Sequence, residues 1–178
     1  MKSAIEFELQ EAVPILRQTP ATLRSLLGEL PDRWVESSGD RSHWHPYDIL
    51  GHLIHGERAD WIPRARIILE QGTERSFDPF DREAMFDASR GESLGTLLTE
   101  FEALRNSNLE ILESWHLSES DFEKEGIHPD FGPVTLGQLL STWAVHDLNH
   151  IFQITRVLAC NYRDEVGPWI KHLAVLQT

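Results

Sequence analysis

The sequence has a single cysteine, Cys160, so the chain cannot form an internal disulfide and nothing in it requires an oxidising compartment. It also lacks any run near the roughly 18 consecutive apolar residues that a membrane-spanning helix needs. The first residues turn acidic at Glu6 and Glu8 and contain no apolar stretch of the kind that a signal peptide carries. These absences predict a soluble, cytoplasmic protein with no membrane partner.

Positive charge is also scarce, because 16 Lys and Arg stand against 29 Asp and Glu and leave a net charge of −13. Such a surface repels phosphate backbones and anionic lipid headgroups, which argues against a nucleic-acid partner. The length predicts one domain over residues 1–178, with 40% hydrophobic residues to form its core. Histidine, in contrast, occurs nine times. Site chemistry is therefore sought first among the histidines.

Helical periodicity dominates the sequence, and nothing alternates at period two over the length of a strand. The predicted helices cover residues 5–17 with a kink at Pro14, 20–30 with Thr19 as N-cap, 46–71 with a bend at Pro63, 94–115, and 135–162, followed by a short tail helix from Pro168. Ser89 and Glu92 have the spacing of a capping box before the fourth of these, and Thr135 and Gln138 have it before the fifth. Residues 126–133 are predicted to be a loop. Several long helices with short connections predict an all-α, four-helix bundle with short extra helices and at least one longer crossover.

Two histidines on the last long helix, His146 and His150, are four residues apart and therefore share one face. Leu139, Trp143 and Ile154 lie on or beside that face, so the pair belongs to the apolar stripe. Buried imidazoles need partners for their ring nitrogens, and a metal ion is one such partner. Backbone groups or water are the other possible partners. The spacing alone therefore does not decide between two metal ligands and two ordinary core histidines.

A third ligand has to come from another helix, and His52 is the best candidate because it shares a face with the small residues Gly56 and Ala59. His55 is expected at the rim of such a site. Asp48 either orients the ring of His52 or only stabilises the first turn of its helix. Three imidazoles leave coordination positions open, which is typical of catalytic and not of structural zinc sites.

Three stretches around these residues resemble the DinB/YfiT-like superfamily of metal-binding four-helix bundles: residues 44–57, 135–140 and 146–154. The resemblance implies that His52, His146 and His150 hold a divalent metal ion. Zn²⁺ or Ni²⁺ is expected first, with Mn²⁺ or Fe²⁺ as alternatives. It also implies a homodimer.

The same resemblance implies a metal-dependent enzyme that acts on a small-molecule substrate, either a hydrolase or a transferase that uses a low-molecular-weight thiol. No residue is assigned as catalytic. A non-enzymatic bundle, stabilised by its metal and serving a sensory or binding role as a dimer, is the alternative. A plain helical bundle with core histidines and no metal is a third interpretation.

Other residues have a structural interpretation beside a functional one. His128 is expected to be a solvated loop histidine, with substrate contact as the alternative. Glu57 is a candidate base, but at five residues from His52 it points about 140° away on an ideal helix and is not expected at the site. Cys160 is expected to be a small core residue.

Two further groups remain open on the sequence alone. Asn149 and Gln153 either contact bound water or make polar contacts between helices. A cluster of cations beside Trp61 either receives an anionic substrate or forms a solvated helix face with local acids. These cations are Arg58, Arg64 and Arg66.

Overall fold

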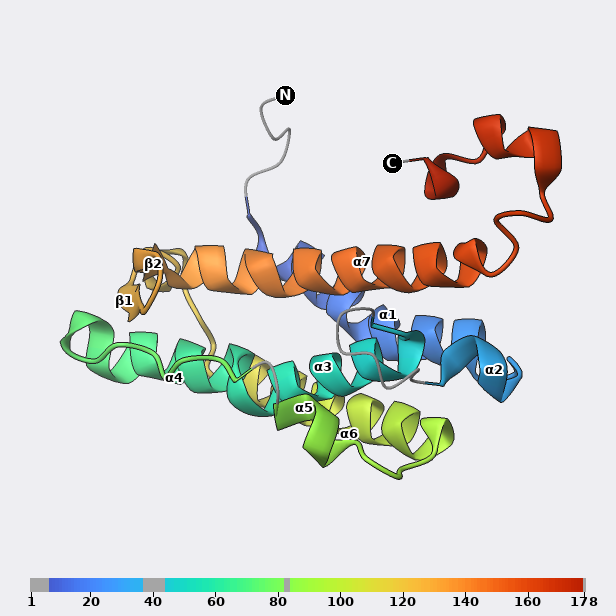
Figure 1. The fold of residues 1–178 in the computed structure, drawn as a ribbon. Helices are drawn as coiled ribbons and strands as arrows, with labels where there is room; N and C mark the ends of the chain where they lie inside the picture. The colour runs from blue at the N-terminus through green and yellow to red at the C-terminus, as the bar shows by residue number, and fades with distance from the viewer. Residues whose placement is uncertain (1–6, 37–43, 82–83, 178) are drawn as a thin grey trace.

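The computed structural model describes residues 7–36, 44–81 and 84–177, and its long helices run alongside one another (Figure 1). They are α1 (Leu9–Leu27), α3 (Pro46–Ala59) continued by α4 (Trp61–Gln71), α6 (Leu94–Ser114) and α7 (Leu136–Cys160). Helix α1 packs against α6 and α7, while α3 packs against α6 and α4 against α7. The predicted all-α four-helix bundle is confirmed.

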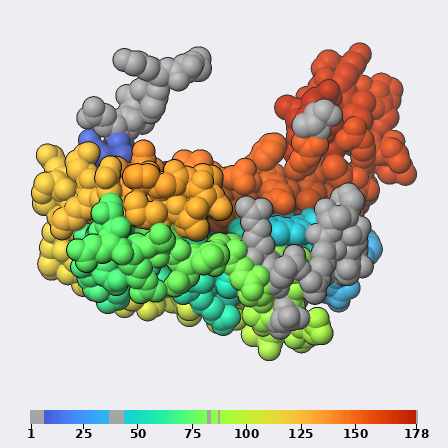
Figure 2. Space-filling view, turned by 60° about the vertical axis from the view of Figure 1, so that its left-hand side comes forward, coloured from blue at the N-terminus to red at the C-terminus, as the bar shows by residue number. Residues whose placement is uncertain are grey.

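Shorter elements connect and extend the bundle. They are α2 (Asp32–Val35), α5 (Ala84–Ala88) and the 3₁₀ helices η1 (Gly72–Glu74), η2 (Glu119–Asp121), η3 (Gly167–His172) and η4 (Ala174–Leu176). The predicted tail helix is the 3₁₀ helix η3. The C-terminal segment projects beyond α7 (Figure 2), and η4 packs back against that helix. No helix in the described part of the chain has the length and apolar character to cross a membrane.

The prediction of two helices in the first 30 residues is wrong, because α1 runs without interruption through Pro14 and Pro20. Its predicted start at residue 5 lies outside the described residues. Pro20 has no N–H, so the carbonyl of Leu16 loses its partner within the helix. Arg105 supplies that partner, since its Nη1 donates to the Leu16 oxygen over 2.7 Å. A side chain from another helix thus compensates for the missing bond.

The predicted helix over residues 46–71 is divided at Asp60, which has φ −108° and ψ −76° and separates α3 from α4. Pro63 is the third residue of α4 and has no N–H to donate. The helical hydrogen-bond pattern of α3 is therefore not continued past Asp60. Gly72 ends α4 with φ 58°, a conformation that favours glycine. Because of this break, α4 takes a new direction and packs along α7, and Asp60 lies at the junction of α3 and α4.

Helix α6 begins at a different cap from the one predicted. Ser93, and not Ser89, accepts a hydrogen bond from the Thr96 N–H over 3.1 Å. The Ser89 hydroxyl donates instead to the carbonyl of Met85. At the start of α7, by contrast, Thr135 and Gln138 form the predicted capping box, with bonds of 3.1 and 3.0 Å.

The predicted loop over residues 126–133 is an antiparallel hairpin, β1 (Glu125–His128) paired with β2 (Gly132–Thr135). Ile127 also accepts a hydrogen bond from the Phe77 N–H, which ties the hairpin to the segment after α4. A Cβ on Gly126 would lie 2.7 Å from Ile68 and 2.9 Å from Phe77, so only glycine permits this close packing. The hairpin is thereby held against α4, just before α7 begins.

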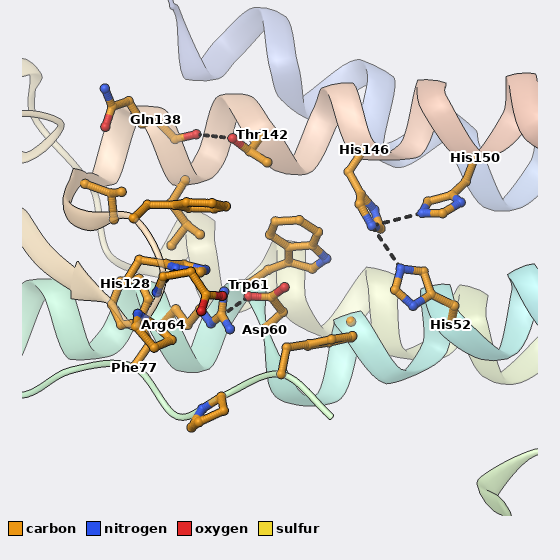
Figure 3. A pocket seen from close by; sticks show the side chains of 18 of the residues that line it. His52, Asp60, Trp61, Arg64, Phe77, His128, Gln138, Thr142, His146 and His150 are labelled. Atoms are coloured by element: carbon orange, nitrogen blue, oxygen red, sulfur yellow. Dashed lines mark hydrogen bonds and ion pairs between the residues drawn. The ribbon is translucent and has the colours of Figure 1, made fainter. Parts of the chain in front are cut away.

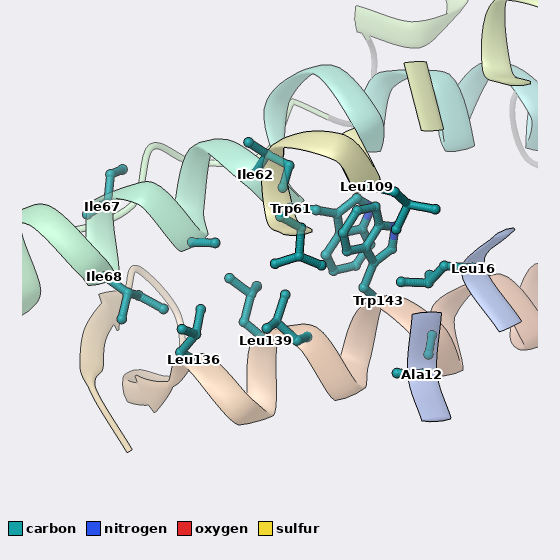
Figure 4. Packing of buried hydrophobic residues seen from close by; sticks show 14 of the residues in the cluster. Ala12, Leu16, Trp61, Ile62, Ile67, Ile68, Leu109, Leu136, Leu139 and Trp143 are labelled. Carbon is teal, nitrogen blue, oxygen red and sulfur yellow. The ribbon is translucent and has the colours of Figure 1, made fainter. Parts of the chain in front are cut away.

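Two apolar clusters form the core. The cluster in Figure 4 is centred on Trp61 and Trp143, whose rings stack with centroids 5.8 Å apart. The second contains Leu53, Phe101 and Ile154. A layer of buried charge lies between them along the helices, formed by Glu57, Arg105 and Asp147, which we call the buried charge layer.

Arg105 is the centre of this layer and has no exposed side-chain surface. Its Nε and Nη2 donate to Glu57 over 3.1 and 2.8 Å, and its Nη1 and Nη2 donate to Asp147 over 2.5 and 2.9 Å. With the bond to Leu16, all five guanidinium N–H groups are used. Burial opposes the charge, but the two carboxylates outweigh it and raise the pKa of Arg105. Arg105 therefore links α6 to α1, α3 and α7.

Candidate metal centre

The three histidines singled out from the sequence come together where α3 faces α7 (Figure 3). The Nε2 atom of His146 lies 3.1 Å from Nε2 of His52 and 3.0 Å from Nε2 of His150. His52 and His150 are buried and His146 is half-buried. The predicted pairing of one α3 histidine with two α7 histidines is therefore what the fold produces.

The local environment favours the neutral form of these rings. Burial, followed by the nearby rings of His150 and His52 and the charge of Arg105, lowers the pKa of His146 to about 3. Burial likewise lowers the pKa of His150, against the opposing effects of Gln153 and Asp147. Neutral imidazole is the form that binds metal ions, because it keeps one nitrogen lone pair free.

Gln153 sets the orientation of one ring. Its side-chain oxygen lies 2.8 Å from Nδ1 of His150, and because that oxygen can only accept, Nδ1 carries the proton. The lone pair of His150 is then on Nε2, the atom that faces His146. Gln153 thus acts as the kind of outer partner that fixes the tautomer of metal-binding histidines.

Aromatic rings enclose the three-histidine cluster. The centroids of Trp44 and Phe80 lie 5.1 and 5.5 Å from that of His52, and Trp61 lies 5.0 Å from His146. Such walls limit the access of water and lower the local dielectric, which strengthens electrostatic interactions at the cluster.

The donor set fits a divalent metal ion. Atoms that share one ion at about 2.0–2.1 Å lie roughly 3 Å from one another, as Nε2 of His146 does from Nε2 of His52 and of His150. Ring nitrogens this close together gain little from each other without a proton or a cation between them. Nδ1 of His146 is also buried and makes no hydrogen bond to any described residue, so no second hydrogen bond fixes this ring.

A cavity of about 660 Å³ opens beside the cluster and continues between α4, α7 and the hairpin. The three histidines form one part of its wall. The rest comes mainly from aromatic and polar side chains, together with Leu139: Trp44, Asp60, Trp61, Arg64, Phe77, Phe80, His128, Phe131, Gln138 and Thr142. A volume of this size suits a small-molecule ligand.

The structure resolves the open roles of the neighbouring residues. Asp48 accepts a hydrogen bond from the His45 N–H over 2.9 Å, so it stabilises the start of α3. His55 packs on Phe80 with centroids 4.7 Å apart and does not join the three-histidine cluster. His128 is half-buried, stacks on Phe131 with centroids 4.3 Å apart and lines the cavity, and it lies in β1 and not in the predicted loop.

Glu57 belongs to the buried charge layer and not to the cluster, as its direction on the helix predicted. It also accepts hydrogen bonds from Trp143 Nε1 over 3.0 Å and from Asn108 Nδ2 over 2.9 Å. Cys160 is exposed at the end of α7, so its expected place in the core is wrong. Asn149 is exposed as well.

The three arginines beside Trp61 divide into two kinds. Arg58 pairs with Glu100 and Arg66 lies 3.9 Å from Glu70, both at the surface. Arg64 is buried and lines the cavity. The sequence did not predict this difference, because all three arginines were expected on one continuous helix. The break at Asp60 changes the direction of α4 and with it the face of α4 that turns inward.

Fold and site together define a four-helix bundle in which facing helices bring three histidines together in an arrangement that fits a metal ion. The comparison with known families agrees with this description. The chain belongs to the DinB superfamily, whose sequence profile matches residues 15–154. The resemblance seen in the sequence is thus confirmed.

Two relatives extend the comparison. A Bacillus licheniformis protein named "Putative metal-dependent hydrolase" is 29% identical over 160 residues, which is 85% of either chain. YfiT from Bacillus subtilis, described as a probable metal-dependent hydrolase with an unusual four-helix bundle topology, matches with a TM-score of 0.73. Its identity is 20%, over 94% of this chain and 92% of YfiT, and at that level the match shows a shared fold.

Proposed function

We propose that the protein is a metal-dependent hydrolase of a small molecule, and that His52, His146 and His150 hold its divalent ion. The observation that carries this proposal is the convergence of three largely buried imidazoles at the wall of a cavity. The names of the relatives support hydrolysis as the reaction. We also propose that residues 1–178 form one such domain.

A divalent ion in this position supplies Lewis-acid chemistry, since it lowers the pKa of a water or thiol and polarises a bound substrate. The protein's own residues prepare the site for it. Gln153 holds the proton of His150 at Nδ1, and the rings of Trp44, Trp61 and Phe80 pack against His52 and His146. The aromatic cavity wall then binds the apolar part of the substrate next to the three histidines.

The reaction can be tested on protein purified without chelator and without a nickel-affinity tag. We expect hydrolysis of small aryl esters or amides that a chelator removes and added Zn²⁺, Ni²⁺, Mn²⁺ or Fe²⁺ restores. His52→Ala should lose this activity, whereas Cys160→Ser, changed at an exposed position at the end of α7, should keep it. Turnover that persists in His52→Ala would contradict the proposal.

Transfer to a low-molecular-weight thiol is the second candidate reaction. The described chain supports it only in that its one cysteine lies at the exposed end of α7 and does not line the cavity, so a reacting thiol has to come from outside. The same assay separates the two reactions. Metal-dependent turnover of an electrophile that requires added thiol and consumes it in equal amount identifies a transferase, and turnover in its absence identifies a hydrolase.

We further propose that the protein is a homodimer formed through α7. Val145, Leu148 and Phe152 follow one another at helical spacing on its outer face and are 62%, 49% and 55% exposed. A contiguous apolar stripe on an exposed helix is typical of an interface. The C-terminal segment also exposes a large apolar side chain, Trp169.

Leu148→Glu is expected to convert the dimer to a monomer, because it places a charge in the centre of this stripe. Size-exclusion chromatography with light scattering measures the change in mass. Ile15→Glu, at an exposed apolar position on α1, is the matched control and should remain dimeric. A wild-type protein that is monomeric at micromolar concentration rejects the proposed interface.

A further inference from the structure

The wall of the cavity contains a second polar group, a largely buried pair of opposite charges away from the three histidines (Figure 3). Asp60 and Arg64 are one turn apart at the start of α4, and Oδ1 of Asp60 lies 2.8 Å from Nε of Arg64. Their side chains retain 15% and 8% exposure, and both line the cavity. Their accessible polar atoms therefore face the cavity.

The contacts within the pair leave much hydrogen-bonding capacity unused. The Asp60 Oδ1 and Arg64 Nε atoms are buried but do not have the geometry of a hydrogen bond. Nη2 of Arg64 makes one long bond, 3.3 Å, to the carbonyl of Asp78. A guanidinium has five donors and a carboxylate has two acceptor oxygens, and leaving such groups unsatisfied when buried is costly. A polar group in the cavity can bond to the atoms of the pair that are not enclosed in this way, Oδ2 of Asp60 and the Nη atoms of Arg64.

The surroundings limit what that group can be. The guanidinium of Arg64 lies over the ring of Phe77, 5.3 Å from its centroid, and Trp61 follows Asp60 directly in the wall. The pair as a whole carries no net charge. Arg64 attracts an anion but Asp60 repels it, and Asp60 attracts a cation but Arg64 repels it. A neutral group with an acceptor and a donor side by side satisfies both members at once, and a carboxamide is the simplest such group.

We propose that Asp60 and Arg64 form a recognition subsite for a carboxamide group of the substrate, with its oxygen on Arg64 and its N–H on Asp60. This inference rests on the proposed function, because the rest of that substrate reaches the three-histidine cluster. Burial raises the pKa of Asp60, and the charge of Arg64 opposes that rise. The charge of Arg64 thus favours the ionised form of Asp60, in which both carboxylate oxygens accept hydrogen bonds.

The dimensions of the cavity require an elongated ligand. His52 and Asp60 both line it and are eight residues apart along α3, which is about 12 Å at 1.5 Å per residue. Aromatic walls lie between the two polar ends and suit a ring or an alkyl chain. The carboxamide bound by Asp60 and Arg64 is therefore not the bond that reacts at the cluster.

The subsite can be tested by binding alone, with 3-phenylpropanamide as the probe and 3-phenylpropanoate as its charged counterpart. Isothermal titration of the zinc-loaded full chain is expected to show amide binding that Arg64→Met weakens about tenfold or more, since a buried hydrogen bond to a charged group is lost. Asp60→Asn should reverse the preference, because it leaves the charge of Arg64 unbalanced and favours the carboxylate. A merely structural role of the pair would not produce this reversal.

Two controls separate this inference from the proposed function. Arg66→Met, on the same helix but at the surface, should leave amide binding unchanged. His52→Ala should lose zinc but retain amide binding, so that the subsite and the metal centre are tested separately. Amide binding that Arg64→Met and Asp60→Asn both leave unchanged, in variants whose circular dichroism matches the wild type, would overturn the assignment.

Discussion

Replacement of Arg105 by methionine is expected to destabilise the protein by about 3–5 kcal/mol. The substitution removes five hydrogen bonds and leaves the carboxylates of Glu57 and Asp147 buried without their counter-charge. It also leaves the Leu16 carbonyl unsatisfied where Pro20 interrupts α1. For a chain of this length the midpoint of thermal unfolding should fall by about 6–20 °C. Thermal denaturation followed by circular dichroism measures the shift.

The matched control is an ion pair at the surface. Arg17 lies 2.6 Å from Glu113 with both side chains about half exposed. Arg17→Met should cost at most about 1 kcal/mol, because solvent screens exposed pairs. If the two substitutions have equal effects, the buried charge layer does not hold the four helices together as described.

Substitution of His146 by alanine is expected to weaken divalent-metal binding by at least about 100-fold. Zinc sites with four ligands bind with about 10–16 kcal/mol, so one ligand contributes about 3 kcal/mol. His146 is the central member, since its Nε2 contacts both other histidines. Competition with a chromophoric chelator measures the affinity. Gln153→Ala, which loses only the partner of His150, should reduce it by about 10–100-fold.

Asn149→Ala serves as the control, because this residue lies between the two α7 histidines in sequence but is exposed. Its metal affinity should equal that of the wild type. If the protein is instead a plain bundle with core histidines, the three variants would not differ in metal affinity. A chelator would then leave the unfolding temperature of the wild type unchanged.

Much of the bundle follows from local sequence signals. Helix α7 has a capping box at Thr135 and Gln138 and an apolar stripe over its whole length, so its start and its histidine-bearing face could be predicted. His52 could be placed with these histidines because its neighbours on α3 are small and because the surrounding motif resembles the DinB family. Both signals are contained within single helices.

The remaining features depend on contacts between distant segments. The hairpin strands have four residues each, too few to show alternation, and their position depends on packing against Phe77 and Ile68. Pro20 suggested a helix start because the compensating donor, Arg105, is 85 residues away in sequence. One signal was available: Arg105 lies four residues after Phe101 and four before Leu109, where an apolar residue is expected on that face. A charge there indicates a buried partner.

The metal content of the wild-type protein tests the central claim most directly. The chain should be produced without a nickel-affinity tag, purified without chelator, and measured by elemental analysis together with a zinc titration. We predict about one divalent ion per chain, lost in His146→Ala. Protein that contains no stoichiometric divalent metal and takes up none on titration would contradict the account.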